Sequence, residues 1–216
     1  MSQFSFLRFK KLRFYFAWPF ATFIALTAKT TALGFWLGIP VIVSGEALRV
    51  WSQGHIEKRT RLANSGPYAY VRNPLYLSNY LIGLGFVLIF SNLWILLIYS
   101  IGFFILYQGT IREEENFLLG EYQDSYQDYF KRVPRFFPTL EAYPNRSNQN
   151  FTWQLVWRHG EHVTFLTILL LVISLYLRQE WYQKGSGFYS NHLFLFWFGM
   201  LILILLVASA LHRKFK

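Results

Sequence analysis

The sequence predicts an all-α fold, a polytopic transmembrane helix bundle of about six spans with a cytoplasmic amphipathic helix after span four. Hydrophobic residues make up 54% of the chain and aromatic residues 21%, which is more apolar than an ordinary soluble domain. Several apolar runs approach the roughly 20 residues that a helix needs to cross a bilayer. The expected spans are approximately Tyr15–Ala28, Thr31–Gln53, Leu75–Phe90, Leu93–Tyr107, Val163–Leu177 and Leu193–Leu211.

The predicted spans differ in length, and short turns join two pairs of them. The first, third and fourth runs are short for a full crossing, so tilting or flanking residues must complete them. Lys29-Thr30 and Ser91-Asn92 are expected as tight turns that join span one to two and span three to four. The N-terminus is basic and then apolar, but no small-residue cleavage site follows it, so a cleaved signal peptide is not expected.

The net charge of +10 indicates membrane topology rather than a nucleic-acid partner. Cytoplasmic loops of membrane proteins are enriched in Lys and Arg. Basic residues here gather before the first span, in the two long polar segments and at the C-terminus, while Lys29, Arg178 and Lys184 fall on the other side. We therefore expect an integral membrane protein with both termini in the cytoplasm and membrane lipids as its surroundings. The chain has no cysteine, which excludes disulfides and thiolate ligands, and no metal site is expected.

The two long polar segments, roughly Gly54–Pro74 and Thr110–His159, both fall on the cytoplasmic side, where the chemistry is expected. An apolar stripe runs through the second segment at spacings of three and four residues, which predicts the amphipathic helix. The stripe consists of Leu118, Tyr122, Tyr126, Tyr129 and Val133. The two prolines in Val133–Pro138 end this helix.

The chain divides into three parts. Residues 1–140 form the predicted membrane core, in which the signature region covers 40–138. Residues 141–158 are rich in Asn, Pro and Ser at their start and are interpreted as a linker. Residues 159–216 form a C-terminal extension of two spans, interpreted as an appendage.

The segment Ser65–Tyr76 is the most informative part of the sequence. Gly66-Pro67 predicts a turn, and Pro74 predicts the first residue of a helix at the membrane edge. The N-terminus of such a helix presents free N–H groups and the positive end of its dipole. With Arg72 beside it, this place suits a carboxylate or a phosphate.

Three polar elements are expected to converge there: the turn Gly66–Pro74, the run Arg112–Glu115 and the end of span two. Carboxylates can hold the hydroxyls of a ribose or an ammonium group. Arg72 and Asn73 can hold a carboxylate, and aromatic rings can stack on a purine or lie against a sulfonium by cation–π attraction. The rings in question are Tyr68, Tyr70 and Tyr76.

Two further groups remain open between structural and functional roles. Glu46 and Arg49 are three residues apart within a span, where charges are costly. They form either an ion pair that locks helices together or part of a pocket. His55 lies on the polar loop and is considered as a contact to substrate or cofactor.

The order of these motifs resembles the signature of the membrane isoprenylcysteine carboxyl methyltransferases and phospholipid methyltransferases. The resemblance covers about residues 40–138. The matching stretches are Leu48-Arg49-x-Trp51, Ser65-Gly66-Pro67-Tyr68-x-Tyr70-Val71-Arg72-Asn73-Pro74-x-Tyr76, Glu113-Glu114-x-x-x-Leu118, and Tyr126-x-x-Tyr129 followed by Val133-Pro134-Arg135-Phe136.

The resemblance implies a helical membrane enzyme that binds S-adenosylmethionine on its cytoplasmic loop and helix ends, while a lipophilic or prenylated substrate enters from the bilayer. It implies that Glu114 holds the cofactor and that Leu62 and Ala63 contact its adenine through backbone groups. The residues implied to line the cofactor site are Tyr68, Asn73, Pro74, Leu75 and Tyr76. Arg112 is the candidate for the family's substrate arginine, although direct alignment of the glutamates puts Thr110 at that position. Arg112, Asn73 and Arg72 are the candidate catalytic residues.

Two features depart from the family pattern. Asn73 stands where the family usually has histidine, and an amide can donate a hydrogen bond but cannot titrate near neutral pH. The extension beyond about residue 150 has no counterpart in the family core.

The predicted function is therefore methylation of a lipophilic substrate at the cytoplasmic face of a membrane, most like an isoprenylcysteine carboxyl methyltransferase. A phospholipid N-methyltransferase is the nearest alternative. An NADPH-dependent membrane reductase of related architecture and a non-catalytic membrane homologue are the alternatives from other classes.

Overall fold

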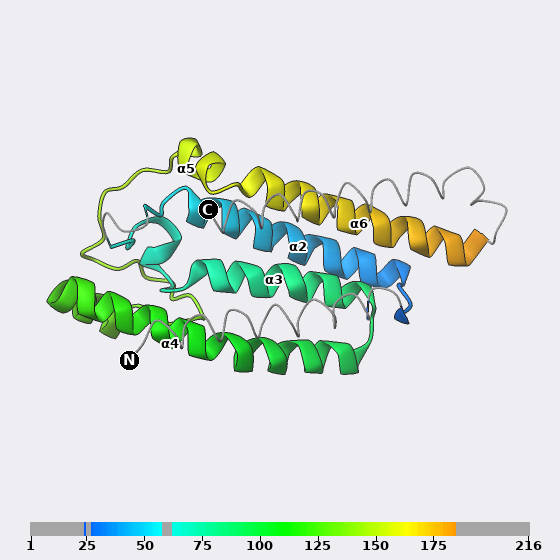
Figure 1. Cartoon of the computed structure of the whole chain (residues 1–216), viewed down its shortest axis with the longest axis horizontal. Coiled ribbons are helices and arrows are strands. Elements are labelled where there is room, and N and C mark those ends of the chain that lie inside the picture. Colours follow the sequence, from blue (N-terminus) through cyan, green and yellow to red (C-terminus); the bar gives the residue numbers. More distant parts are fainter. Residues whose placement is uncertain (1–23, 25–26, 58–61, 185–216) are drawn as a thin grey trace.

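The computed structural model describes Ile24, residues 27–57 and residues 62–184. Within them the chain forms helices and no strand, which confirms the all-α class. The helices are α2 (Ala32–Gln53), the 3-10 helix η1 (Gly66–Ala69), α3 (Pro74–Ile89), α4 (Leu93–Arg132), α5 (Trp153–Arg158) and α6 (Glu161–Lys184). The four long helices lie side by side in the order α6, α2, α3, α4, with α5 and η1 at one end (Figure 1).

Three helices are long and apolar enough to cross a membrane: α2, α4 as far as Gln123, and α6 up to Glu180. The shorter helix α3 is also apolar. Large apolar side chains stand exposed along these helices, among them Trp36, Trp94 and Phe165, as expected of surfaces that face lipid. The predicted last span and most of the first lie outside the described residues, so the number of six spans stays a prediction, as does the cytoplasmic orientation.

Close packing of α2 on α3 depends on small residues. A side chain at Gly38 would clash with the carbonyl oxygen of Gly85, and one at Gly34 would clash with that of Ile89. Small residues let helix backbones approach closely in membranes, where packing rather than water exclusion holds helices together. This contact fixes α2 and α3 as one rigid pair.

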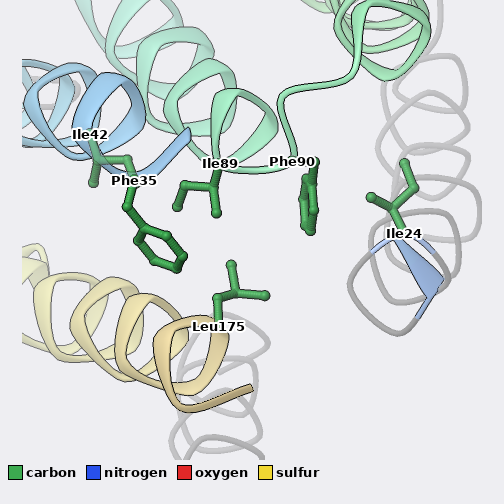
Figure 2. Close-up of a cluster of buried hydrophobic side chains, with 6 residues drawn as sticks. All are labelled: Ile24, Phe35, Ile42, Ile89, Phe90 and Leu175. Atoms are coloured by element: carbon green, nitrogen blue, oxygen red, sulfur yellow. The ribbon is translucent and has the colours of Figure 1, made fainter. Parts of the chain in front are cut away.

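The expected turn at Ser91-Asn92 is confirmed. Asn92 caps α4, since its side chain accepts hydrogen bonds from the backbone N–H groups of Trp94 (2.9 Å) and Ile95 (3.2 Å). Across the turn, the hydroxyls of Ser91 and Thr31 lie 2.6 Å apart. Nearby, six buried apolar side chains from α2, α3, the turn, α6 and Ile24 form a cluster (Figure 2).

Helix α4 continues past Tyr107, the predicted end of the fourth span, and includes the helix predicted after that span. No proline interrupts it, and it continues through the charged run to Arg132, with a break in helical geometry at Gln123 (φ 42°, ψ −119°). Beyond this kink, Tyr126, Tyr129 and Val133 are buried against Ala69 and Tyr143. The predicted apolar stripe thus packs on the turn that precedes α3.

Residues 141–158, interpreted as a linker, pack against the core. The backbone N–H of Tyr143 donates to the carbonyl of Ala69 (2.9 Å), and that of Thr152 donates to Gly54 (3.0 Å). Leu155 and Val156 of α5 are buried. The segment therefore connects the turn, the end of α2 and the start of α6.

Candidate functional site

The turn before α3 is held in place from two sides. Gly66 has a positive φ of 56°, and a side chain there would clash with the ring of His55, so glycine is required. Backbone N–H groups of Arg72 and Thr139 donate to the carbonyls of Pro134 (2.9 Å) and Tyr70 (3.0 Å). The returning segment 134–143 thus lies along the turn and fixes where α3 begins.

Glu115 of α4 is the charged centre of this arrangement and is only 3% exposed. Its carboxylate accepts from Arg72 Nε (3.2 Å), from Asn73 Nδ2 (3.3 Å) and from Arg135 Nη2 (2.5 Å). A buried charge is tolerated when its partners satisfy it in this way. Glu115 therefore joins the end of the turn, α4 and the segment after α4.

Arg72 is fully engaged inside the protein. Its side chain is 8% exposed, it pairs with Glu115 at 3.1 Å, and its Nη1 donates to the carbonyl of Phe130. The guanidinium carbon also lies 3.9 Å from the centre of the Phe130 ring, a cation–π contact. This geometry favours a positioning role for Arg72 over direct contact with a substrate.

Asn73 is the N-cap of α3, although no side-chain hydrogen bond caps the helix. Its amide donates to Glu115 and to the carbonyl of Arg135 (3.2 Å). Pro74, the first residue of α3, is buried. The amide at the position of the family histidine thus supports the frame around the start of α3.

The neighbouring carboxylate, Glu114, is half-buried and turns toward α3. The Tyr76 hydroxyl donates to Glu114 Oε1 at 2.9 Å. The Tyr76 ring also meets the Tyr107 ring edge-on, with their centres 5.4 Å apart. A carboxylate beside aromatic rings is an arrangement suited to a cationic ligand.

Two buried hydroxyls in this region have no hydrogen-bond partner among the described residues: those of Tyr68 and Thr110. Burial raises the pKa of Tyr68 well above its usual range, and the Glu114 carboxylate raises it further. The Tyr68 hydroxyl therefore stays protonated. Buried polar groups without a partner are rare, and they call for a ligand or a water.

The structure brings together most of the predicted site residues but not all of them. Arg112 is exposed, and none of the contacts among the described residues joins it to Glu114 or Glu115. Leu62 packs at the edge of the aromatic cluster around Tyr126 and Tyr129. Ala63 and Leu75 are half-buried. The roles assigned to these four residues, like those of the other predicted site residues, stay predictions.

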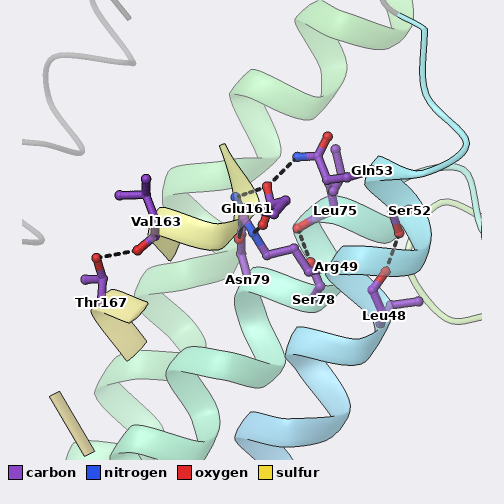
Figure 3. A network of polar contacts seen from close by, with 10 residues as sticks. All are labelled: Leu48, Arg49, Ser52, Gln53, Leu75, Ser78, Asn79, Glu161, Val163 and Thr167. Carbon is purple, nitrogen blue, oxygen red and sulfur yellow. Dashed lines mark hydrogen bonds and ion pairs between the residues drawn. The ribbon is translucent and has the colours of Figure 1, made fainter. Parts of the chain in front are cut away.

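A second polar network, separate from the one around Glu115, lies where α2, α3 and α6 meet (Figure 3). Arg49 Nε and Nη2 donate to the two oxygens of Glu161 at 2.7 and 3.1 Å, and Arg49 Nη1 donates to Asn79. Gln53 Nε2 also donates to Glu161 (2.9 Å). Arg49 thus pairs with Glu161 of the C-terminal extension, and the expected extension is locked to the core.

His55 packs behind the turn. Its Nδ1 lies 3.3 Å from the Ser65 hydroxyl, and its ring meets that of Phe151 edge-on. Burial lowers the pKa of His55, so the imidazole is neutral at physiological pH. No contact among the described residues joins it to Glu114.

Sequence reasoning left three important residues out of the site. Glu115 belongs to the acidic run that was recognised, but the pattern does not tell which glutamate turns inward. Thr110 was noted only as an alignment position. Glu161 lies outside the family signature. Its position as an acidic residue at the start of an apolar run was the one sequence feature that could have marked it.

Comparison with known proteins bears on the same region. Residues 22–125 match the profile of the phospholipid methyltransferase family. The chain is 33% identical over 119 residues to the cobalt-zinc-cadmium resistance protein CzcN of Cupriavidus metallidurans, covering 54% of this chain and 51% of that protein. It is 31% identical over 115 residues to the nickel-cobalt-cadmium resistance protein NccN of Alcaligenes xylosoxydans xylosoxydans, covering 51% of each chain.

A third relative is the protein-S-isoprenylcysteine O-methyltransferase of Schizosaccharomyces pombe, 33% identical over 124 residues, which is 55% of this chain and 52% of that protein. The chain thus spans about half the length of the curated relatives it matches. No solved structure matches. The family resemblance inferred from the motifs is confirmed.

Proposed function

We propose that this chain, whose residues 22–125 belong to the phospholipid methyltransferase family, is an integral membrane methyltransferase that uses S-adenosylmethionine. The single observation that carries the proposal is the Glu114–Tyr76 pair at the start of α3, 2.9 Å apart. It lies at the end of the bundle where the signature turn, α3 and α4 meet.

The residues present fit the cofactor. Glu114 offers a carboxylate, which suits the ammonium group or the ribose hydroxyls of the ligand. Tyr76 and Tyr107 offer ring faces and edges for a sulfonium. The hydroxyls of Tyr68 and Thr110, which have no hydrogen-bond partner among the described residues, offer polar contacts to the ligand.

When bound, S-adenosylmethionine supplies a methyl group already activated by its sulfonium. The protein's task is then to bind, to align and to exclude water, since orientation alone supplies much of the rate of such reactions. Glu115, Arg72 and Asn73 do not need to touch substrate for this purpose, because they hold α3 against α4. In this proposal Glu114 and Tyr76 hold the ligand.

The methyl acceptor is proposed to be lipophilic, with a carboxylate as its reacting group. An ionised carboxylate needs no deprotonation before it attacks, whereas an ammonium must first lose a proton. Asn73 cannot take that proton, and the buried His55 does not contact Glu114 in the described part of the chain. The isoprenylcysteine methyltransferase relative favours the same substrate class.

A phospholipid amine is the second candidate acceptor, and the matching family's name favours it. The two products differ in chemistry, because a methyl ester is cleaved by base and releases methanol, while an N-methyl group is stable.

The test is to incubate the purified protein in lipid nanodiscs with tritium-labelled S-adenosylmethionine, prenylated cysteine acceptors and aminophospholipids. We expect base-labile tritium in the prenylated product. Base-stable tritium in the lipid would favour the second candidate. Absence of transfer to either acceptor, with wild type and Glu114→Gln alike, would contradict the proposed activity.

A further inference from the structure

A separate cavity of about 570 Å³ lies between α2 and α6, within the size range of small-molecule sites. Helix α2 contributes Ile42, Glu46 and Val50, and helix α6 contributes Phe165, Leu169 and Val172. Phe151 and Trp153 of the preceding segment also line it. Its walls are apolar apart from one side chain, Glu46, so the cavity suits a hydrocarbon chain.

Glu46 is the unusual feature of this cavity. It is 7% exposed, and neither of its carboxylate oxygens has a hydrogen-bond partner in the part of the chain that the structure describes. Arg49, one turn further along α2, is already engaged by Glu161 and Asn79. A carboxylate among apolar walls is costly unless a donor meets it.

The cavity is distinct from the proposed methyl-transfer site. Glu114 and Tyr76 lie between α3 and α4, whereas the cavity lies on the other side of α2 and needs α6 for its second wall. Helix α6 also lies outside the residues that match the family profile. The C-terminal extension therefore builds a site that the family core alone does not provide.

We propose that this cavity binds a long-chain amphiphile with a primary ammonium head, which donates to Glu46 while its hydrocarbon chain lies between α2 and α6. A cationic head beside Glu46 favours the ionised carboxylate, whose oxygens only accept hydrogen bonds, so the head must donate. A positive charge complements the single acidic group, and an anionic head of the same size would be repelled. The inference does not depend on methyl transfer.

The test uses a 12-carbon amine with a photoreactive diazirine in its chain, and a matched 12-carbon carboxylic acid, on the full chain in phosphatidylcholine nanodiscs. Mass spectrometry locates the label. We expect the amine to label residues 39–51 and 165–172 at concentrations where the acid does not. Nanodiscs containing phosphatidylethanolamine add a second source of the same head group, and competition there would identify a bilayer lipid as the occupant.

Three variants make the test decisive. Glu46→Gln keeps the shape and removes the charge, and we expect at least about a tenfold loss of apparent affinity for the amine. Leu169→Trp fills the cavity and is expected to abolish labelling. Glu121→Gln, an exposed carboxylate on α4, is the matched control and should leave labelling unchanged.

Equal labelling by amine and acid, or unchanged labelling in Glu46→Gln, would overturn the proposal and leave an apolar groove filled by bulk lipid. Labelling confined to other helices would overturn it as well. None of these results depends on cofactor binding.

Discussion

At the scale of single residues, the adjacent glutamates Glu114 and Glu115 have different roles. Glu115 faces inward and binds Arg72, Asn73 and Arg135, while Glu114 faces α3 and accepts a hydrogen bond from the Tyr76 hydroxyl. The pair therefore separates a structural carboxylate from a candidate ligand carboxylate, one position apart.

Replacing Glu114 by Gln is expected to weaken cofactor binding by at least about tenfold, because a charge-assisted contact to the ligand is lost. Thermal stability should change little, since Glu114 is half-buried. Calorimetric titration with S-adenosylhomocysteine measures the first quantity and a circular-dichroism melt the second. Unchanged affinity would remove Glu114 from the site.

Replacing Glu115 by Gln is expected to act mainly on stability, unlike the change at Glu114. It leaves the buried Arg72 guanidinium without its carboxylate, and breaking one side of a buried ion pair costs about 3–5 kcal/mol. We expect a large fall in unfolding free energy, measured by denaturation in detergent. A stability equal to that of Glu121→Gln would contradict the role of Glu115.

Asn73→His restores the residue that the family usually has. Because the Asn73 amide donates to Glu115 and Arg135, and an imidazole can also donate, we expect cofactor affinity within about threefold of wild type. The pH profile of methyl transfer should keep its shape. A new ionisation near neutral pH with a large gain in rate would show that this position moves a proton.

At the scale of elements, the C-terminal helix α6 is joined to the core by a largely buried ion pair. Glu161 is 2% exposed and binds Arg49 of α2 and Gln53 beside it. The extension had been interpreted as an appendage, because sequence alone could not connect Glu161 with Arg49, more than 100 positions earlier. The pairing instead makes α6 a wall of the bundle.

Glu161→Gln is accordingly expected to lower the unfolding free energy by about 3 kcal/mol, since the Arg49 charge stays largely buried without its partner. Arg132→Gln, which breaks an exposed pair with Asp128, is the matched control and should lower the unfolding free energy much less, because water screens exposed pairs. Equal effects of the two changes would show that the α2–α6 pair does not hold the helices.

The helices themselves were more predictable than their ends. The apolar runs gave the positions of α2, α3 and α6 and the turn at Ser91-Asn92. The amphipathic helix expected after the fourth span is confirmed, and the structure joins it to that span in one helix, because no residue between Tyr107 and the charged run breaks a helix. The stripe through Tyr126 and Tyr129 was predicted, since its spacing is local.

At the scale of the whole molecule, one end of the bundle gathers the signature turn, the acidic run of α4 and the start of α6 (Figure 1). The order of motifs along the chain was enough to predict that the first two meet. Sequence composition and spacing do not show how helices far apart in the chain pack together. That packing decides which carboxylates face inward and whether a cavity forms beside Glu46.

The predicted orientation places that end in the cytoplasm. The chain has no cysteine, so a single introduced thiol reports its own side of the membrane. We expect a membrane-impermeant maleimide to label Ser91→Cys in intact cells and Ser125→Cys only after permeabilisation. Both serines are exposed. The reverse pattern would contradict the positive-inside assignment.

The most direct test of the central claim is calorimetric titration of the purified, folded protein with S-adenosylhomocysteine. The proposed function predicts saturable binding that weakens at least about tenfold in Glu114→Gln and is unchanged in Glu121→Gln. Absence of binding by wild-type protein whose cooperative melt shows it to be folded would contradict the claim.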